Sequence, residues 1–231
     1  MKITGYIAMN LYGFYLKVVK GIRTNKMLFK LIYGFNPPPA LWGQYWDWTT
    51  LTLRNCLKEY VNRATKLMDM GCGPYAVLSR YAKSKLHCPE VSAADHCLEL
   101  INFARDNDCE SGITYLHSDL FANINSRFSL ILFNAPYLES DKGKSKGLFP
   151  DALSRKRFCG GTQGIETIQR FLQDAPQYIE KEGMLMLGIN QFHISRELVE
   201  SSIFQAGYKV SSIRFNPLTK ACVYILKEKK Q

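Results

Sequence analysis

The stretch Lys66-Leu-Met-Asp-Met-Gly-Cys-Gly-Pro-Tyr-Ala-Val-Leu78 places an apolar run, a glycine-containing turn and a helical pattern in direct succession. Gly71 and Gly73 carry no side chain, so the backbone of the turn can approach a ligand closely. The helix that follows offers free N–H groups at the carboxyl end of the strand. We therefore expect a strand, a ligand-binding turn and a helix that has Pro74 in its first turn. A tight turn without a ligand is the alternative interpretation.

From residue 66 onward, apolar stretches typical of strands alternate with stretches of helical periodicity. This alternation predicts an α/β fold of the Rossmann-like, doubly wound type: a mainly parallel, seven-stranded sheet covered by helices on both faces. The last two strands are separated only by residues 216–219, too few for a helical crossover, which predicts a hairpin and an antiparallel terminal strand. Strands are expected at 66–70, 91–95, 113–117, 128–133, 184–190, 208–215 and 221–227, and helices at 49–63, 74–84, 97–107, 164–180 and 193–206. Residues 141–147, rich in lysine and glycine, are expected to form a mobile loop.

Two further strands of the expected sheet end on acidic residues. The second strand ends at Asp95, at the distance from the glycine turn at which a carboxylate can accept the hydroxyl protons of a ribose. The third ends at His117-Ser118-Asp119-Leu120, where Asp119 can meet an adenine amino group. Either acid alone is more often a helix N-cap. Two acids at successive strand ends after a glycine turn favour a nucleoside-containing cofactor.

With these motifs, residues 49–231 resemble the class I S-adenosylmethionine-dependent methyltransferases. The resemblance implies S-adenosylmethionine as cofactor, with Asp69, Gly71 and Gly73 flanking its methionine part. It implies that Asp95 binds the ribose and Asp119 the adenine. The predicted cofactor-binding residues are Asp69, Gly71, Cys72, Gly73, Asp95, His96, Ser118, Asp119, Leu120 and Asn134. One departure is Tyr75, which replaces the last glycine of the family's D-x-G-x-G-x-G motif and could obstruct the cofactor.

The fourth expected strand runs directly into Asn134-Ala135-Pro136-Tyr137. An amide or exocyclic amine is a weak nucleophile because its lone pair is delocalised, so its methylation depends on positioning. The Asn134 side-chain oxygen and the Ala135 carbonyl can accept the N–H bonds of such a group, while the Tyr137 ring can stack on its plane. The predicted catalytic residues are therefore Asn134, Ala135, Pro136 and Tyr137.

This tetrapeptide resembles the N-P-P-Y motif of methyltransferases that act on planar nitrogen. Ala135 replaces the first proline, but the proposed acceptor is a backbone carbonyl, and Pro136 still favours an extended Ala135. Residues 160–166, 175–178 and 183–187 resemble the stretch that follows N-P-P-Y in release-factor glutamine methyltransferases. The resemblance implies N-methylation of a protein or a nucleic acid. A small-molecule N-methyltransferase and a non-catalytic binding module are the alternatives.

The formal net charge of +10 is concentrated in the N-terminal part of the chain. Residues 1–66 contain ten Lys and Arg but only two acids, Asp47 and Glu59, whereas the remainder is nearly neutral. This asymmetry predicts an acidic partner, which can be a nucleic acid, an anionic membrane surface or an acidic protein. Apolar residues at helical spacing from Ile7 to Ile22 predict a basic amphipathic helix or helix pair, which either docks on the rest of the protein or contacts a substrate or a membrane. We expect a helical N-terminal extension over residues 1–48, followed by a methyltransferase domain over residues 49–231.

Three further features narrow the class of protein. The seven cysteines form no C-x-x-C pair, which favours reduced thiols and a cytoplasmic location over disulfides or a zinc site. The four histidines lack the spacing of metal ligands, so no metal is expected, and we interpret His193 as structural or exposed. No apolar run is long enough to predict a transmembrane helix. The tryptophan-rich residues 42–48 either attach the extension to the domain or line a pocket.

Overall fold

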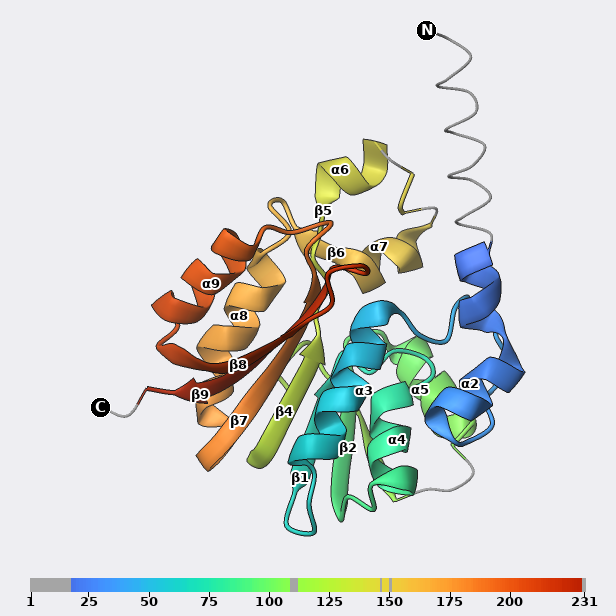
Figure 1. Ribbon diagram of the computed structural model, residues 1–231, viewed down its shortest axis with the longest axis horizontal. Helices are drawn as coiled ribbons and strands as arrows, with labels where there is room; N and C mark the ends of the chain where they lie inside the picture. The colour runs from blue at the N-terminus through green and yellow to red at the C-terminus, as the bar shows by residue number, and fades with distance from the viewer. Residues whose placement is uncertain (1–17, 109–111, 146, 150, 230–231) are drawn as a thin grey trace, which may run out of the picture. The chain divides into compact units, whose positions relative to one another are not determined.

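The computed structural model describes residues 18–108, 112–145, 147–149 and 151–229 (Figure 1). Contacts divide the chain into a unit Met1–Asp47 and a unit Trp48–Gln231. No helix among the described residues is long and apolar enough to cross a membrane.

The first unit is helical where it is described. Residues 18–24 are helical, and Asn25 then caps α2 (Lys26–Tyr33) by accepting a hydrogen bond of 2.8 Å from the backbone N–H of Leu28. Gly34 ends α2 in the left-handed conformation, with φ of 77°. An aromatic cluster stabilises this unit internally and consists of Phe29, Tyr33, Phe35, Tyr45 and Trp46. The predicted amphipathic helix beginning at Ile7 lies mostly outside the described residues.

The second unit contains the predicted sheet. In the described part of the chain this sheet has seven strands in the order β3-β2-β1-β4-β7-β9-β8. The strands from β3 to β7 in this order are parallel, whereas β9 runs antiparallel to both β7 and β8. The predicted hairpin and antiparallel terminal strand are therefore confirmed. The bounds are β1 (Lys66–Met70), β2 (Glu90–Asp95), β3 (Ile113–His117), β4 (Phe128–Asn134), β7 (Ile179–Asn190), β8 (Tyr208–Phe215) and β9 (Ala221–Glu228).

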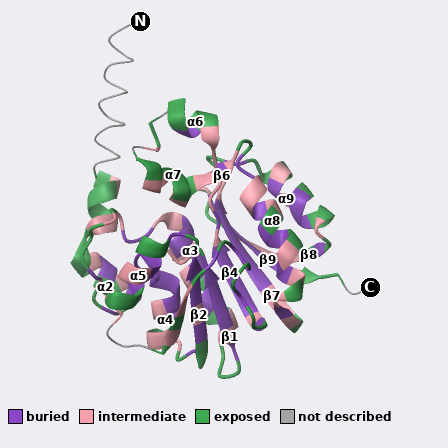
Figure 2. Cartoon of the chain, turned by 180° about the vertical axis from the view of Figure 1, so that it is seen from behind, coloured by how far each residue is buried: buried purple, intermediate pink, exposed green. Residues whose placement is uncertain are grey.

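Helices cover both faces of the sheet, as the alternating pattern predicted. On one face, apolar side chains of α3 (Trp48–Tyr60) and α4 (Val77–Lys85) pack on β1, β2, β4, β7 and β9. On the other face, α8 (Glu166–Asp174) and α9 (Arg196–Gln205) cover a second apolar layer. The helix α5 (Leu98–Asp106) packs against β2 and β3 on the same side of the sheet as α3 and α4 (Figure 1). Figure 2 shows the central strands buried between these helices. Helices packed on both faces of the sheet thus fix the positions of its strands. They also fix the end of the sheet at which β1, β2, β3 and β4 terminate.

Three local predictions were wrong. The first α/β helix begins at Val77 rather than at residue 74, because Ala76 has a left-handed backbone with φ of 41°. The helix predicted over 164–180 ends at Asp174, and a 3₁₀ turn, Ala175–Gln177, leads into β7. The predicted mobile loop 141–147 instead contains most of α6 (Ser140–Ser145), where buried Gly143 lies against the Phe149 ring. The helix α7 (Ala152–Phe158) follows it, and a small two-stranded sheet pairs β5 (Leu138–Glu139), which precedes α6, with β6 (Cys159–Gly161), which follows α7.

Candidate active site

The glycine turn after β1 borders open space. Gly71 and Gly73 have φ of 66° and 65°, a region that favours glycine. The backbone N–H of Cys72 donates to the Ala94 carbonyl at 3.0 Å, so the turn is anchored to the end of β2. A Cβ atom added to Gly73 would meet no atom within 4 Å, whereas one added to Gly71 would lie 3.1 Å from the Phe133 ring. The open side of the turn at Gly73 can therefore receive a ligand.

Asp95 joins the carboxyl ends of three strands. Its Oδ2 accepts from the Gly73 N–H at 3.0 Å and its Oδ1 from the Cys97 N–H at 2.9 Å. Its carbonyl accepts from the Ser118 N–H at 3.0 Å, and His96 Nδ1 lies 3.5 Å from Oδ1. Each carboxylate oxygen has more than one acceptor site, so these bonds leave capacity for hydroxyl donors. A buried carboxylate beside the open turn fits the ribose of S-adenosylmethionine.

The Asp69 side chain ties β1 to α4. Its Oδ2 accepts from both the backbone N–H and the hydroxyl of Ser79, at 3.1 and 2.5 Å. Burial raises the pKa of this carboxyl to about 7, with a smaller raising effect from Asp95, while the Ser79 bonds lower it. Burial likewise raises the pKa of the Cys72 thiol well above its usual value, so Cys72 is a neutral thiol. The roles expected of Asp69 and Cys72 beside the methionine part stay predictions.

The turn after β3 holds Asp119 at the surface. Asp119 Oδ2 accepts from Arg170 Nη2 of α8 at 2.9 Å, and both side chains are largely exposed. The buried Ser118 hydroxyl donates to the Leu120 carbonyl at 2.7 Å and accepts from the Asn123 N–H at 3.0 Å. Leu120 has a left-handed backbone with φ of 48°, which this hydroxyl bridge supports. The predicted contacts of this turn with adenine remain predictions.

Tyr75 does not fill the space beside the glycine turn. Its ring is buried and packs edge-on against Phe103 of α5, with ring centroids 6.2 Å apart. Because no atom lies within 4 Å of a Cβ built on Gly73, the tyrosine leaves that side of the turn open. From α7, Arg157 interacts electrostatically with Tyr75 and Asp95, and burial lowers the pKa of its guanidinium.

The Asn134-Ala135-Pro136-Tyr137 motif begins at the last residue of β4, beside the glycine turn. Met70 pairs with Phe133 in the sheet, so Gly71 and Asn134 each follow a paired residue on neighbouring strands. The Ala135 N–H donates to the Gly188 carbonyl of β7 at 3.1 Å. The Asn134 Nδ2 donates to the Thr50 hydroxyl of α3 at 3.2 Å. This bond turns the Asn134 Oδ1 away from Thr50 and thus sets which edge of the amide can accept.

The ring of Tyr137 is stacked on a second ring. The His193 imidazole lies nearly parallel to it, with centroids 5.9 Å apart and an interplanar angle of 18°. The sequence did not indicate this pairing, and we interpreted His193 as structural or exposed. Thr50 was also missed, because it is 84 positions from Asn134 and belongs to no motif.

Glycines of the segment after α7 pack against the backbone of the motif. A Cβ on Gly164 would lie 2.5 Å from the Tyr137 carbonyl oxygen, and one on Gly160 would lie 2.7 Å from that of Pro136. Gly164 also has φ of 80°, which disfavours other residues. Glu166 supports this glycine segment by accepting from the backbone N–H groups of Gln163 and Ile165 at 2.9 and 3.0 Å. The sequence contained these glycines, but their contact with the motif follows only from the fold.

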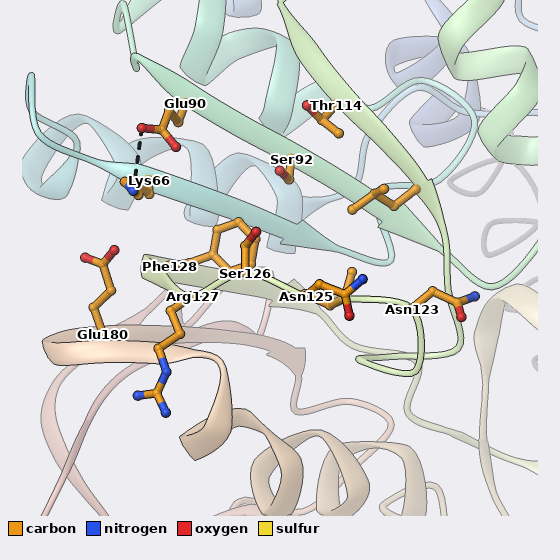
Figure 3. Close-up of a pocket in the computed structure, with 12 residues that line it drawn as sticks. Lys66, Glu90, Ser92, Thr114, Asn123, Asn125, Ser126, Arg127, Phe128 and Glu180 are labelled. Carbon is orange, nitrogen blue, oxygen red and sulfur yellow. Dashed lines mark ion pairs between the residues drawn. The ribbon is translucent and has the colours of Figure 1, made fainter.

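A polar pocket lies at the opposite end of the strands (Figure 3). Its walls include Lys66, Glu90 and Phe128, which begin β1, β2 and β4, and Lys66 Nζ lies 3.7 Å from Glu90 Oε1. None of the residues predicted to bind cofactor or acceptor lines it. The pocket is therefore separate from the candidate active site.

Comparison with known proteins finds relatives among the glutamine methyltransferases. A protein of Methanocaldococcus jannaschii, named as a protein N5-glutamine methyltransferase, is 31% identical over 157 residues, which are 67% of this chain and 76% of that protein. A ribosomal protein uL3 glutamine methyltransferase of Bradyrhizobium diazoefficiens is 29% identical over 157 residues, covering 63% and 46% of the two chains. Release factor glutamine methyltransferases also match. The matches span about half the length of these bacterial relatives.

Solved structures share the fold. A methyltransferase of Pyrococcus furiosus superposes with a TM-score of 0.63 over 87% of this chain and 92% of that one, at 17% sequence identity. A ribosomal protein L11 methylase of Lactobacillus delbrueckii subsp. bulgaricus gives a TM-score of 0.59 over 79% of each chain, at 16% identity. No family model matches the chain.

Proposed function

Because the chain belongs to the S-adenosylmethionine-dependent protein glutamine methyltransferases, we propose that it methylates the side-chain amide nitrogen of a glutamine in a protein. The observation that carries the proposal is the position of Asn134-Ala135-Pro136-Tyr137 at the carboxyl end of β4, beside the open glycine turn of β1. Neighbouring parallel strands bring two expected sites to the same end of the sheet: the site for the methyl donor, called the donor side, and the site for the methyl acceptor, called the acceptor side.

The donor side would be formed by the ends of β1, β2 and β3. Asp95 would accept from the ribose hydroxyls, and the Gly71–Gly73 turn would flank the methionine part. Asp119 can bind Arg170 through Oδ2 and still offer Oδ1 to the adenine amino group. When bound, S-adenosylmethionine supplies a methyl group that its positive sulfonium makes electrophilic.

The acceptor side holds and orients the target nitrogen. A glutamine amide has two N–H bonds, which the Asn134 Oδ1 and the Ala135 carbonyl would accept. These two bonds fix the nitrogen and favour loss of its planarity, while Tyr137 packs against the amide plane. Thr50 holds the Asn134 amide in the accepting orientation, and the Gly188 carbonyl holds the Ala135 peptide. Such preorganised acceptors contribute most in the transition state, where the nitrogen becomes pyramidal.

Relatives of this chain suggest a protein of the translation machinery as the acceptor. Two groups of relatives are named for ribosomal protein uL3 and for release factors. An acceptor of this kind would place the reaction in the cytoplasm, in accord with free thiols at all six cysteines in the described ranges. The basic N-terminal unit, whose sequence has no acidic residue before Asp47, would bind an acidic surface of the acceptor.

The proposal is tested by locating the transferred methyl group. The purified protein is incubated with methyl-labelled S-adenosylmethionine and, separately, with a release factor, ribosomal protein uL3 and total RNA from the same cells. We expect label on one glutamine side chain of one protein, identified by peptide mass spectrometry, and none on RNA. Label on RNA, on a small molecule or on another type of side chain would refute the proposal.

A further inference from the structure

Two loops at the carboxyl edge of the sheet expose large apolar side chains. Phe192 follows β7 and is 68% exposed, while Phe215 and Leu218, at the β8–β9 turn, are 44% and 88% exposed. We call these three residues the apolar rim. Large apolar side chains gathered at a surface indicate a binding site more often than single ones do.

Hydrogen bonds join the two loops of the apolar rim. The Gln191 N–H donates to the Lys220 carbonyl at 2.9 Å, and the Asn190 Nδ2 donates to the Thr219 carbonyl at 3.0 Å. Within its own loop, the Phe192 N–H donates to Asn190 Oδ1 at 3.0 Å. The rim is thus preorganised, which lowers the entropic cost of binding a partner.

The rim is continuous with the acceptor side of the active site. His193, the residue after Phe192, stacks on Tyr137 of the motif. Asn134 of β4 pairs with Gly188 of β7, so the loop after β7 leaves the sheet beside the motif. Figure 1 shows this loop and the β8–β9 turn at the end of the sheet where β4 leads into β5.

We propose that the apolar rim binds an apolar segment of the acceptor polypeptide next to the methylated glutamine. The inference rests on the proposed function. A glutamine side chain is short, so when its amide reaches Asn134 the main chain that carries it must cross the border of the site. Apolar residues of that chain would be buried against Phe192, Phe215 and Leu218, and this burial contributes affinity.

The chain contains a matched control for this proposal. Phe204 has the same exposed fraction as Phe192, 68%, but it lies at the end of α9, just before β8 begins at the opposite edge of the sheet. Replacing both Phe192 and Leu218 with Ser removes exposed apolar surface from the rim. Phe204→Ser removes it elsewhere, and all three side chains are exposed enough for the fold to tolerate the change.

The test uses two synthetic peptides with one central glutamine, flanked by Leu and Phe in one and by Ser in the other. Binding is measured by fluorescence anisotropy, and methyl transfer is measured separately. We expect the wild type and Phe204→Ser to bind the apolar peptide about tenfold more tightly, equivalent to about 1.4 kcal/mol. The Phe192→Ser/Leu218→Ser variant should lose this preference and keep its affinity for S-adenosylmethionine.

Measuring peptide binding and methyl transfer separately distinguishes failure of the rim proposal from failure of the proposed function. Equal binding of both peptides by the wild type, or an unchanged preference in the rim variant, would overturn the proposal. A rim-dependent preference without any methyl transfer to glutamine would support the rim and contradict the proposed function.

Discussion

The bond from Asn134 Nδ2 to the Thr50 hydroxyl gives a prediction that separates catalysis from stability. Thr50→Val keeps the shape of the side chain but removes the acceptor that Thr50 offers to the amide. A hydrogen bond of this kind contributes about 0.5–1.5 kcal/mol, so the preference for the accepting orientation of Asn134 should weaken by about that amount. If the whole effect appears in the transition state, turnover falls by about two- to tenfold.

The neighbouring Thr49 provides the control for this variant. It is also buried, and its hydroxyl donates to the Ile189 carbonyl at 3.3 Å. Thr49→Val should therefore lower the free energy of unfolding by a similar amount while turnover stays near wild type. Thr50→Ser, which keeps the hydroxyl, should restore turnover. Steady-state kinetics on the labelled acceptor, together with urea unfolding of each variant, make the comparison. Equal turnover in Thr50→Val and Thr49→Val would refute the positioning role.

Three further predictions concern the cofactor side, a buried acid and the loop glycines. Asp95→Ala should weaken S-adenosylmethionine binding by about 1.5–3 kcal/mol in calorimetry, because it removes a charge-assisted hydrogen bond; unchanged affinity in a folded variant would contradict the ribose assignment. The pKa of Asp69 is raised to about 7, so between about pH 4 and 7 the folded state keeps a proton that the unfolded state has lost, and stability falls as pH rises. Urea unfolding should show that the free energy of unfolding falls over this pH range in the wild type but not in Asp69→Asn. If the free energy of unfolding changes with pH in the same way in both proteins, the raised pKa of Asp69 is contradicted. Gly164→Ala and Gly207→Ala both place a side chain on a left-handed backbone, at a cost of about 1–2 kcal/mol. Only Gly164→Ala meets the Tyr137 carbonyl, so only it should also lower turnover, and equal turnover in both variants would contradict the contact.

The sequence predicted those parts of the fold that depend on local patterns. Strands such as Lys66–Met70 and Ile113–His117 match their expected bounds because short stretches rich in apolar residues, set between segments of helical periodicity, are typical of strands. The helix after the glycine turn begins later than expected, because an alanine in a sequence does not predict the left-handed conformation that Ala76 adopts. α6 was missed because Lys and Gly are typical of loops, and the contact of its buried Gly143 with Phe149 leaves no local pattern in the sequence.

The active-site motifs are also contiguous in the sequence, but the residues that contact and position them are distant from them along the chain. Asn134-Ala135-Pro136-Tyr137 is contiguous and follows an apolar strand, so its position was predictable. Thr50 and His193 meet the motif only after α3 and the loop following β7 have packed at the same sheet edge. Long-range contacts of this kind leave no periodic or motif signal in a single sequence.

The central claim is that Asn134 accepts a hydrogen bond from the nitrogen that is methylated, and the Asn134→Ala variant tests it most directly. Its turnover on the labelled protein acceptor and its affinity for S-adenosylmethionine should be measured on the same preparation. We predict that turnover falls about a hundredfold or more, as on loss of one preorganised polar group, while cofactor affinity changes little. Turnover close to wild type would contradict the claim, because the transferred methyl group would then not depend on an acceptor at the end of β4.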